Sequence, residues 1–150
     1  MREASYFDLP ALLALGARMH AESPHFNQIA FSETKLRETL MAVMGAPNGF
    51  LWIVGRDGKI AGVMVGIAMQ HWCSIDMVAS ELALFVEQEH RGSLIAPRLI
   101  KRYLSWARSI GCKQITAGVS TGVKVDNTTA QDGRLEFKQY GTQLEATWDS

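Results

Sequence analysis

The sequence lacks most of the features that would tie the protein to a metal, a disulfide or a membrane. It has only two cysteines, Cys73 and Cys112, with neither a CxxC pair nor zinc-ligand spacing. This predicts reduced thiols in a core and no metal site. The uncharged stretch at residues 60–75 is shorter than the roughly 20 apolar residues that span a bilayer. The first residues show no signal-peptide pattern. We therefore expect a cytoplasmic protein that does not cross a membrane.

The sequence also has no excess of charge of either sign. Fifteen lysines and arginines balance fifteen aspartates and glutamates, and the isoelectric point is about 6.9. Because affinity for nucleic acid comes largely from a basic surface, this balance argues against nucleic acid as a partner. The hydrophobic fraction of 47% is too high for a disordered chain. A length of 150 residues fits one domain, so we expect a single domain over residues 1–150.

The chain alternates between helical and strand patterns. Helices are predicted at 8–23, 32–45, 96–110 and 128–135, and strands at 50–54, 60–69, 77–86, 113–119 and 141–148. Asp8 is the expected N-cap of the first helix. Alternation along 77–86 would place Glu81 on one face together with Ala79, Ala83 and Phe85. The order α-α-β-β-β-α-β-α-β predicts an α/β fold, with a mixed sheet covered by helices and one parallel crossover.

The most informative segment is the polar turn at residues 87–95, between the third strand and the third helix. The first amides of a helix have no partner within it, and the helix dipole adds positive potential, so a phosphate could bind there. Gly92 permits close approach of a ligand, and Ala96 has little side chain to obstruct it. Arg91 and Arg98 could add charged contacts. The alternative, of equal weight, is that these residues only serve turn geometry and solvation.

The run EHRGSLIAPRLI, residues 89–100, resembles the acetyl-CoA-binding motif of the GNAT acetyltransferase superfamily, Arg/Gln-x-x-Gly-x-Gly/Ala. Arg91 matches the first position and Ala96 the last, whereas Leu94 replaces the middle glycine. The order of the elements is also similar to that of the family. The opening REASYFDLPALLALGARMHAES and the ending LEFKQYGTQLE resemble small GNAT proteins of bacteria and their phages. The resemblance therefore implies a single GNAT-like acyl-CoA N-acyltransferase domain.

The resemblance implies transfer of an acetyl group from acetyl-CoA to a primary amine, of a small molecule or a protein, by direct attack in a ternary complex. Main chain of the third strand would bind the pantetheine arm, and amides of the turn would bind the diphosphate. The residues implied in cofactor binding are Leu84, Phe85, Val86, Arg91, Gly92, Ser93, Leu94, Ile95, Ala96 and Asn127. By analogy with similar proteins, two copies could pair through their C-terminal strands as a homodimer.

Two residues are candidates for a general base, which is useful because an amine with a pKa near 10 is mostly protonated at pH 7. Glu81 lies between two small residues that leave space for a ligand, and similar enzymes often have an acidic residue there. The alternative is an exposed glutamate in a cross-strand pair. His71 is the second candidate because its ordinary pKa, about 6.5, suits proton transfer. Its alternative is a structural or surface role.

Two departures from the family pattern motivate a second hypothesis. The family's general acid is a tyrosine four residues before the glycine of a Leu-Gly-Phe signature. Here Glu136 stands in place of that glycine and Asp132 in place of the tyrosine. Together with Leu94, these residues suggest a non-catalytic acyl-CoA-binding or protein-interaction module on the same scaffold.

Overall fold

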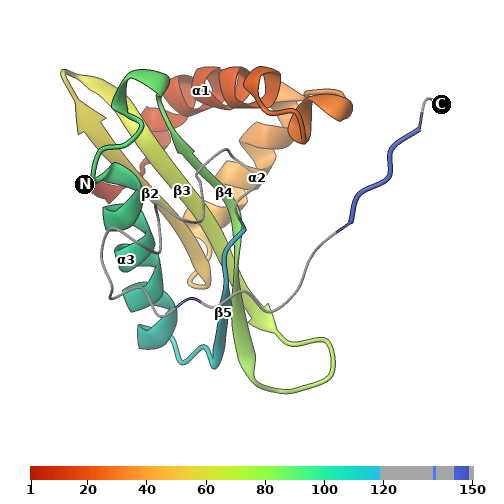
Figure 1. The fold of residues 1–150 in the computed structure, drawn as a ribbon. Coiled ribbons are helices and arrows are strands. Elements are labelled where there is room, and N and C mark those ends of the chain that lie inside the picture. The colour runs from red at the N-terminus through yellow and green to blue at the C-terminus, as the bar shows by residue number, and fades with distance from the viewer. Residues whose placement is uncertain (119–136, 138–143, 149–150) are drawn as a thin grey trace.

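The computed structural model describes residues 1–118, 137 and 144–148, which include a five-stranded mixed sheet with helices on both faces (Figure 1). The helices and strands are β1 (Arg2–Glu3), α1 (Leu9–Glu22), α2 (Glu33–Gly45), β2 (Gly49–Arg56), β3 (Lys59–Gln70), β4 (Met77–Val86), α3 (Ile95–Ser109) and β5 (Gln114–Thr116). The strands lie in chain order. The first four are antiparallel to their neighbours, and β5 is parallel to β4. The predicted mixed sheet covered by helices is confirmed.

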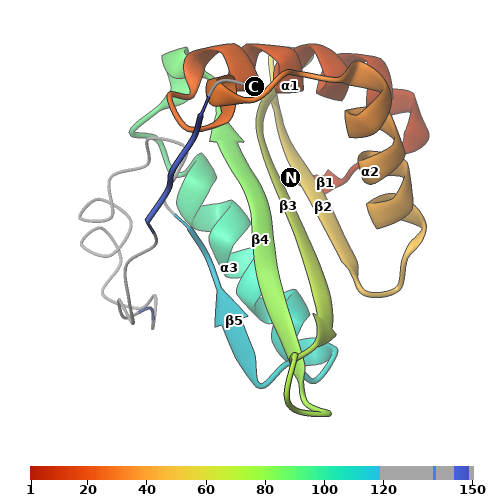
Figure 2. The same cartoon turned by 90° about the vertical axis from the view of Figure 1, so that its right-hand side faces the viewer.

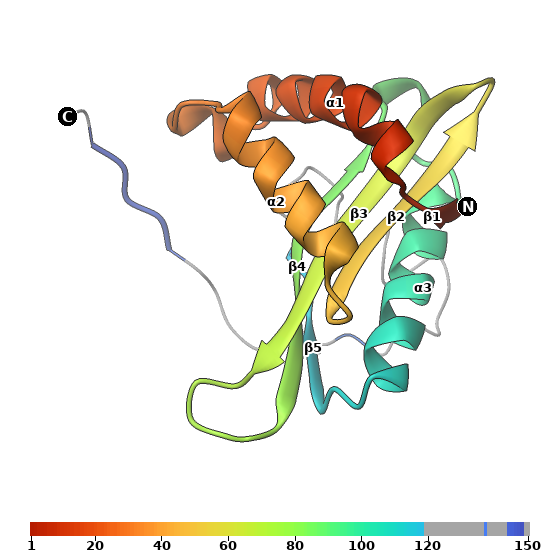
Figure 3. The same ribbon diagram turned by 180° about the vertical axis from the view of Figure 1, so that it is seen from behind.

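Helix α3 covers one face of the sheet, and α1 and α2 cover the other (Figures 2 and 3). A hydrophobic core lies between the sheet and the helices on each face. The core beneath α3 contains Phe50, Val54, Ala61, Met64, Ala68, Ala79, Leu84, Val86, Ile95, Leu99, Ile100, Tyr103 and Ala107. The core beneath α1 and α2 contains Leu9, Leu12, Leu13, Leu15, Leu40, Val43, Leu51, Ile53, Val63, Val65 and Phe85. Because both faces are covered, the middle of β3 is buried residue after residue rather than alternately.

The three helices begin and end within two residues of the predicted positions, and Asp8 is the N-cap residue of α1, as predicted. The Ser32 hydroxyl accepts the Lys35 N–H at 3.1 Å and caps α2. Asp8 makes no such bond to α1. Its carboxylate instead accepts from the Ser5 N–H and from both terminal nitrogens of Arg2, each at 2.8 Å. The Arg2 guanidinium holds the pKa of Asp8 well below its usual range.

The alternation predicted along β4 is wrong in its second half because the strand contains a bulge. Ala83 pairs with Val65 and Glu81 pairs with the next residue, Gly66, so Leu82 is an extra residue. The bulge reverses the faces that follow: Leu84 packs under α3, whereas Phe85 packs under α1 and α2. Glu81 therefore lies on the α3 side of the sheet and does not share a face with Phe85. Composition and spacing alone did not indicate this extra residue.

Three other expectations need correction or lie outside the described residues. Cys73 is exposed, not in a core, and Cys112 is partly buried. The described part of the predicted last strand, residues 144–148, forms no strand. Its polar side chains contact the α1–α2 connection instead, Glu145 at His25 and Thr147 at Gln28. The predicted helix at 128–135 and residues 141–143 are not among the described residues.

Gly62 on β3 allows α3 to lie close to the sheet, and its replacement by alanine is expected to destabilise the fold. A Cβ at this position would lie 2.5 Å from Cγ2 of Ile95, the first residue of α3. Forced overpacking of this kind costs about 1–3 kcal/mol. Urea denaturation of Gly62→Ala measures the loss. Gly55→Ala is the matched control, because its Cβ would make only an ordinary contact at 3.6 Å. Equal stabilities of the two variants would contradict the close approach.

Candidate active site

The site lies where the two parallel strands of the sheet separate. β4 and β5 pair only over three residues, from Val78 opposite Gln114 to Ser80 opposite Thr116 (Figure 2). β4 then continues to Val86 while β5 ends. The Thr116 hydroxyl lies at this fork, within 3.3 Å of the Ser80 hydroxyl and 3.4 Å of the Ala79 carbonyl oxygen. Beyond Ser80, one edge of β4 has no strand beside it among the described residues.

Main-chain groups on this open edge of β4 are available to a ligand. The Glu87 N–H donates to the Ala61 carbonyl on β3 at 2.9 Å. Because an antiparallel strand turns alternate residues towards each neighbour, the main chains of Leu84 and Val86 face the open edge. The Val86 carbonyl accepts from Nε of Arg91 at 3.0 Å. The main chain of Leu84 has no such partner among the described residues, and its side chain is buried in the core.

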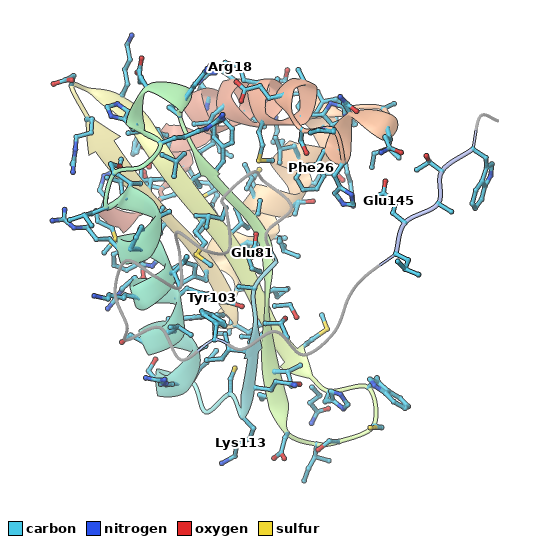
Figure 4. All side chains as sticks on the ribbon, in the orientation of Figure 1. Arg18, Phe26, Glu81, Tyr103, Lys113 and Glu145 are labelled. Atoms are coloured by element: carbon cyan, nitrogen blue, oxygen red, sulfur yellow. The ribbon has the colours of Figure 1, made fainter. Side chains whose placement is uncertain are left out.

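Glu81 stands at the fork itself (Figure 4). Its carboxylate Oε2 accepts the N–H of Gly118 at 2.7 Å, across the gap between β4 and the segment that follows β5. Burial raises the pKa of Glu81, and the hydrogen bond from Gly118 offsets part of that increase. The result is a carboxylate with increased affinity for a proton, next to unpaired main chain. Of the two predicted bases, Glu81 is the one that lies at the fork.

The turn that precedes α3 presents free amides at the other end of this open edge. Gly92 has a φ of +84°, and a Cβ there would meet no atom within 4 Å. The amides of Gly92, Leu94 and Ala96 have no hydrogen-bond partner among the described residues, whereas that of Ile95 donates to Oγ of Ser93 at 3.3 Å. Leu94 has a φ of −79°, and its side chain is 59% exposed, which shows that this position does not need a glycine.

The Arg91 side chain shapes this turn and is not a free cation. Besides its bond to the Val86 carbonyl, the guanidinium donates to Glu22 at 2.7 Å and lies over the Phe85 ring, 5.5 Å from its centroid. A second ion pair, Arg18 with Glu87, joins α1 to the same turn. These contacts connect the turn to β4 and α1. The Arg98 side chain is exposed.

The remaining candidates lie elsewhere. His71 lies in the hairpin between β3 and β4, at the opposite end of β4 from the turn before α3 (Figure 1). Its Nδ1 is 3.3 Å from Sγ of Cys73, and the structure does not bring it to the fork. Asn127, Asp132 and Glu136 lie outside the described residues. Within the described part of the chain, no group of three or more His, Cys, Asp or Glu side chains could hold a metal ion, and no helix is both long and apolar enough to cross a membrane.

Comparison with known families agrees with this geometry. The sequence model of the acetyltransferase (GNAT) family matches residues 16–132. The chain belongs to the GNAT family. Members of this family use acetyl-CoA, and the match spans both the fork and the turn before α3. A search of curated proteins finds no match.

Solved structures share the GNAT fold at low sequence identity. Glucosamine-6-phosphate N-acetyltransferase from Arabidopsis thaliana has a TM-score of 0.74 and 13% identity, with 99% of this chain and 97% of that chain covered. An aminoglycoside antibiotic 6'-N-acetyltransferase from Acinetobacter haemolyticus has a TM-score of 0.71 and 14% identity, with the same coverage. A transcriptional regulator from Bacillus halodurans has a TM-score of 0.73 and 16% identity, with 98% and 97% covered. At such identities the likeness shows the fold alone.

The residues of this GNAT chain fit acetyl-CoA in two places. Diphosphates bind well to free amides at the start of a helix, and the turn before α3 presents three of them beside an unobstructed Gly92. An amide-containing arm needs main-chain partners in an extended edge, which Leu84 offers. Sequence reasoning missed one residue, Tyr103 of α3. Its buried phenol, which needs a hydrogen-bond partner, was the available signal.

Proposed function

We propose that this GNAT protein is an N-acetyltransferase that moves an acetyl group from acetyl-CoA to a primary amine of a small molecule or a protein, by direct attack in a ternary complex. The observation that carries the proposal is the position of Glu81. It is a partly buried carboxylate at the fork, on the strand whose open edge leads to the free amides of the turn before α3. A carboxylate at this point can accept a proton from the acceptor amine while the cofactor lies along β4.

Cofactor binding is assigned to main chain rather than to side-chain charge. The amides of Gly92, Leu94 and Ala96 would hold the diphosphate, and the main chain of Leu84 would hold the pantetheine arm. Ser93 is proposed to keep the Ile95 amide oriented through its hydroxyl, and Arg91 to keep the turn against β4 and α1, as their contacts support. Val86 is proposed to contribute its main-chain N–H on the same edge and Asn127 to lie near the cofactor arm, whereas the main chain of Phe85 is paired with β3 and faces away from the cofactor.

Acetyl transfer requires the protein to position the two substrates and to supply a proton acceptor. When bound, acetyl-CoA supplies an acetyl group activated as a thioester. Glu81 would take a proton from the acceptor amine, directly or through one water, so that the nitrogen lone pair is free to attack. The new bond joins nitrogen to the acetyl carbon, and the bond that breaks joins that carbon to sulfur. A free cysteine thiol has a pKa of about 8.5, and the thiol of coenzyme A is likewise a far stronger acid than an alcohol, so water can return its proton.

The protein is expected to gain thermal stability from acetyl-CoA. A ligand that binds only the folded state at about 100 times its Kd stabilises that state by about 2.7 kcal/mol. For a chain of this size the melting temperature then rises by several degrees, at about 2–4 °C per kcal/mol. Differential scanning fluorimetry checks this, with adenosine, which lacks the diphosphate and the pantetheine arm, as the control ligand. No shift at millimolar acetyl-CoA would contradict the proposed cofactor site.

Release of the coenzyme A thiol across a panel of amines then tests transfer itself. Thiol release that depends on both amine and acetyl-CoA is the expected result. Binding without release for small amines and for peptides with free amino groups would favour the second candidate, a non-catalytic acyl-CoA-binding module. In that candidate function the free amides of the turn before α3 would still bind the cofactor, but Glu81 would have no chemical role.

A further inference from the structure

The ring of Tyr103 on α3 fits a space that a glycine leaves on β3. Gly66 on β3 is paired with Glu81 on the neighbouring strand, β4. A Cβ on Gly66 would come within 2.7 Å of the Tyr103 ring. The tyrosine is completely buried, and the rings of Phe50 and Trp106 lie 5.4 and 5.7 Å from it. The ring therefore has one packed position, beside the residue pair that precedes the bulge of β4.

The hydroxyl of Tyr103 reaches beyond this packing to the fork. It donates to the carbonyl oxygen of Thr116, the last residue of β5, at 3.2 Å. Thr116 is also the residue whose hydroxyl approaches Ser80 on β4. Two residues later the chain presents the Gly118 N–H to the Glu81 carboxylate at 2.7 Å. The Tyr103 hydroxyl thus bonds the last residue of β5, two residues before Gly118, whose N–H donates to Glu81. Figure 4 labels Tyr103 and Glu81 on the ribbon.

We propose that Tyr103 is a positioning residue for acetyl transfer, whose hydroxyl holds the Thr116 carbonyl so that the Gly118 N–H stays directed at Glu81. The inference rests on the proposed function, because it matters to the reaction only if Glu81 is the base. Packing alone does not need the hydroxyl, since phenylalanine would fill the same space. A buried hydroxyl is costly unless it makes a hydrogen bond, and this one makes its bond at the end of β5.

Loss of the Tyr103 hydroxyl is expected to change the pKa of Glu81 in one direction. Among the described residues, Tyr103 on α3 interacts electrostatically with Glu81, and Cys112, after α3, interacts with Tyr103. Burial raises the pKa of Cys112, so its thiol is neutral near pH 7. The Gly118 N–H is the group that lowers the pKa of Glu81. When the end of β5 is held less firmly, that bond weakens, and the pKa of Glu81 rises further.

The test is Tyr103→Phe, which removes one oxygen and keeps the ring. We expect kcat to fall about three- to tenfold, the effect of one hydrogen bond, and the acid limb of the kcat/KM profile to move to higher pH. Acetyl-CoA affinity is expected to change by less than about twofold. Tyr6→Phe is the matched control, because Tyr6 is 57% exposed and far from the fork in the sequence. A wild-type rate and pH profile for Tyr103→Phe would overturn the proposal, whatever its melting temperature.

Two further measurements keep the proposal testable. If Tyr103→Phe does not fold, 3-fluorotyrosine at position 103 keeps the ring and donates a stronger hydrogen bond, so the acid limb is expected to move to lower pH; no movement would overturn the proposal. NMR titration of carbon-13-labelled glutamate needs no substrate. A higher titration midpoint of Glu81 in Tyr103→Phe supports the positioning role even if no amine is acetylated. An unchanged midpoint overturns that role, while the proposed function still rests on thiol release by the wild-type protein.

Discussion

Replacing Glu81 with glutamine is expected to lower kcat/KM for acetyl transfer by about 10²–10⁴-fold, the usual contribution of a general base. Glutamine keeps the size of the side chain and an oxygen that can accept the Gly118 N–H. Acetyl-CoA affinity is therefore expected to change little, since the amides of the turn before α3 are untouched. Steady-state kinetics and isothermal calorimetry measure the two effects. Glu38→Gln on α2 is the control, because Glu38 is exposed and outside the site.

The protonation of Glu81 also predicts how kcat/KM and folding stability depend on pH. Because burial raises the pKa of Glu81 in the folded protein, its base form appears only above that increased pKa, and kcat/KM rises with pH through it. In the unfolded chain the carboxyl has its ordinary, lower pKa. Folding stability therefore falls as pH rises between the two values.

Glutamine mimics the protonated form, so Glu81→Gln gains stability relative to the wild type as pH rises through that interval. A wild-type rate for Glu81→Gln on an accepted amine, with no change in the acid limb, would exclude Glu81 as the base. A stability difference between the two proteins that does not vary with pH would contradict the burial of its charge.

Replacing Leu94 with aspartate is expected to move stability and cofactor binding in opposite directions. Leu94 is the N-cap residue of α3 and makes no capping bond, and the first turn holds no acidic residue. An aspartate there could accept the Ala96 N–H and interact with the helix dipole, which stabilises by about 1 kcal/mol. The same carboxylate would accept the hydrogen bonds of amides that are proposed to bind the diphosphate. Its negative charge would also repel the diphosphate. Like charges about 4 Å apart near a surface repel by about 4 kcal/mol before screening.

We therefore expect Leu94→Asp to melt higher than the wild type yet bind acetyl-CoA at least about tenfold more weakly. Leu94→Asn is the matched control, because asparagine caps a helix about as well without a charge. It is expected to keep most of the stability gain and lose much less affinity. Thermal melting and calorimetry on the three proteins separate capping from charge. Wild-type affinity in Leu94→Asp would exclude this helix start as the diphosphate site.

The helices and the turn before α3 were predictable because their signals are local. An apolar stripe at helical spacing, the Ser32 cap and the glycine after α3 each act over a few residues. The motif around Arg91 and Gly92 likewise lies within one turn. Asp8 is the N-cap residue of α1, as predicted, but it makes no capping bond. Its carboxylate instead bonds Arg2, on a strand too short to be predicted from its sequence.

The bulge of β4 was not predictable from the strand itself. An extra residue at Leu82 appears only when the register with β3 is known, and it reverses the faces on which Leu84 and Phe85 lie. The same holds for Arg91, whose partners Glu22 and Val86 come from α1 and β4. The alternation of residues along one strand carries no information about its register with the neighbouring strand.

The sequence by itself determined the order of the elements from α1 to β5, the two apolar faces that the sheet must bury, and the family motif. It could do so because periodicity, caps and turn residues act through nearest neighbours. Only the tertiary structure decided that Glu81, and not His71, lies at the fork, that Gly118 is its hydrogen-bond donor, and that a tyrosine on α3 holds the end of β5. Those relations join residues distant in sequence, and they exist only once the strands have paired and α3 has packed on them.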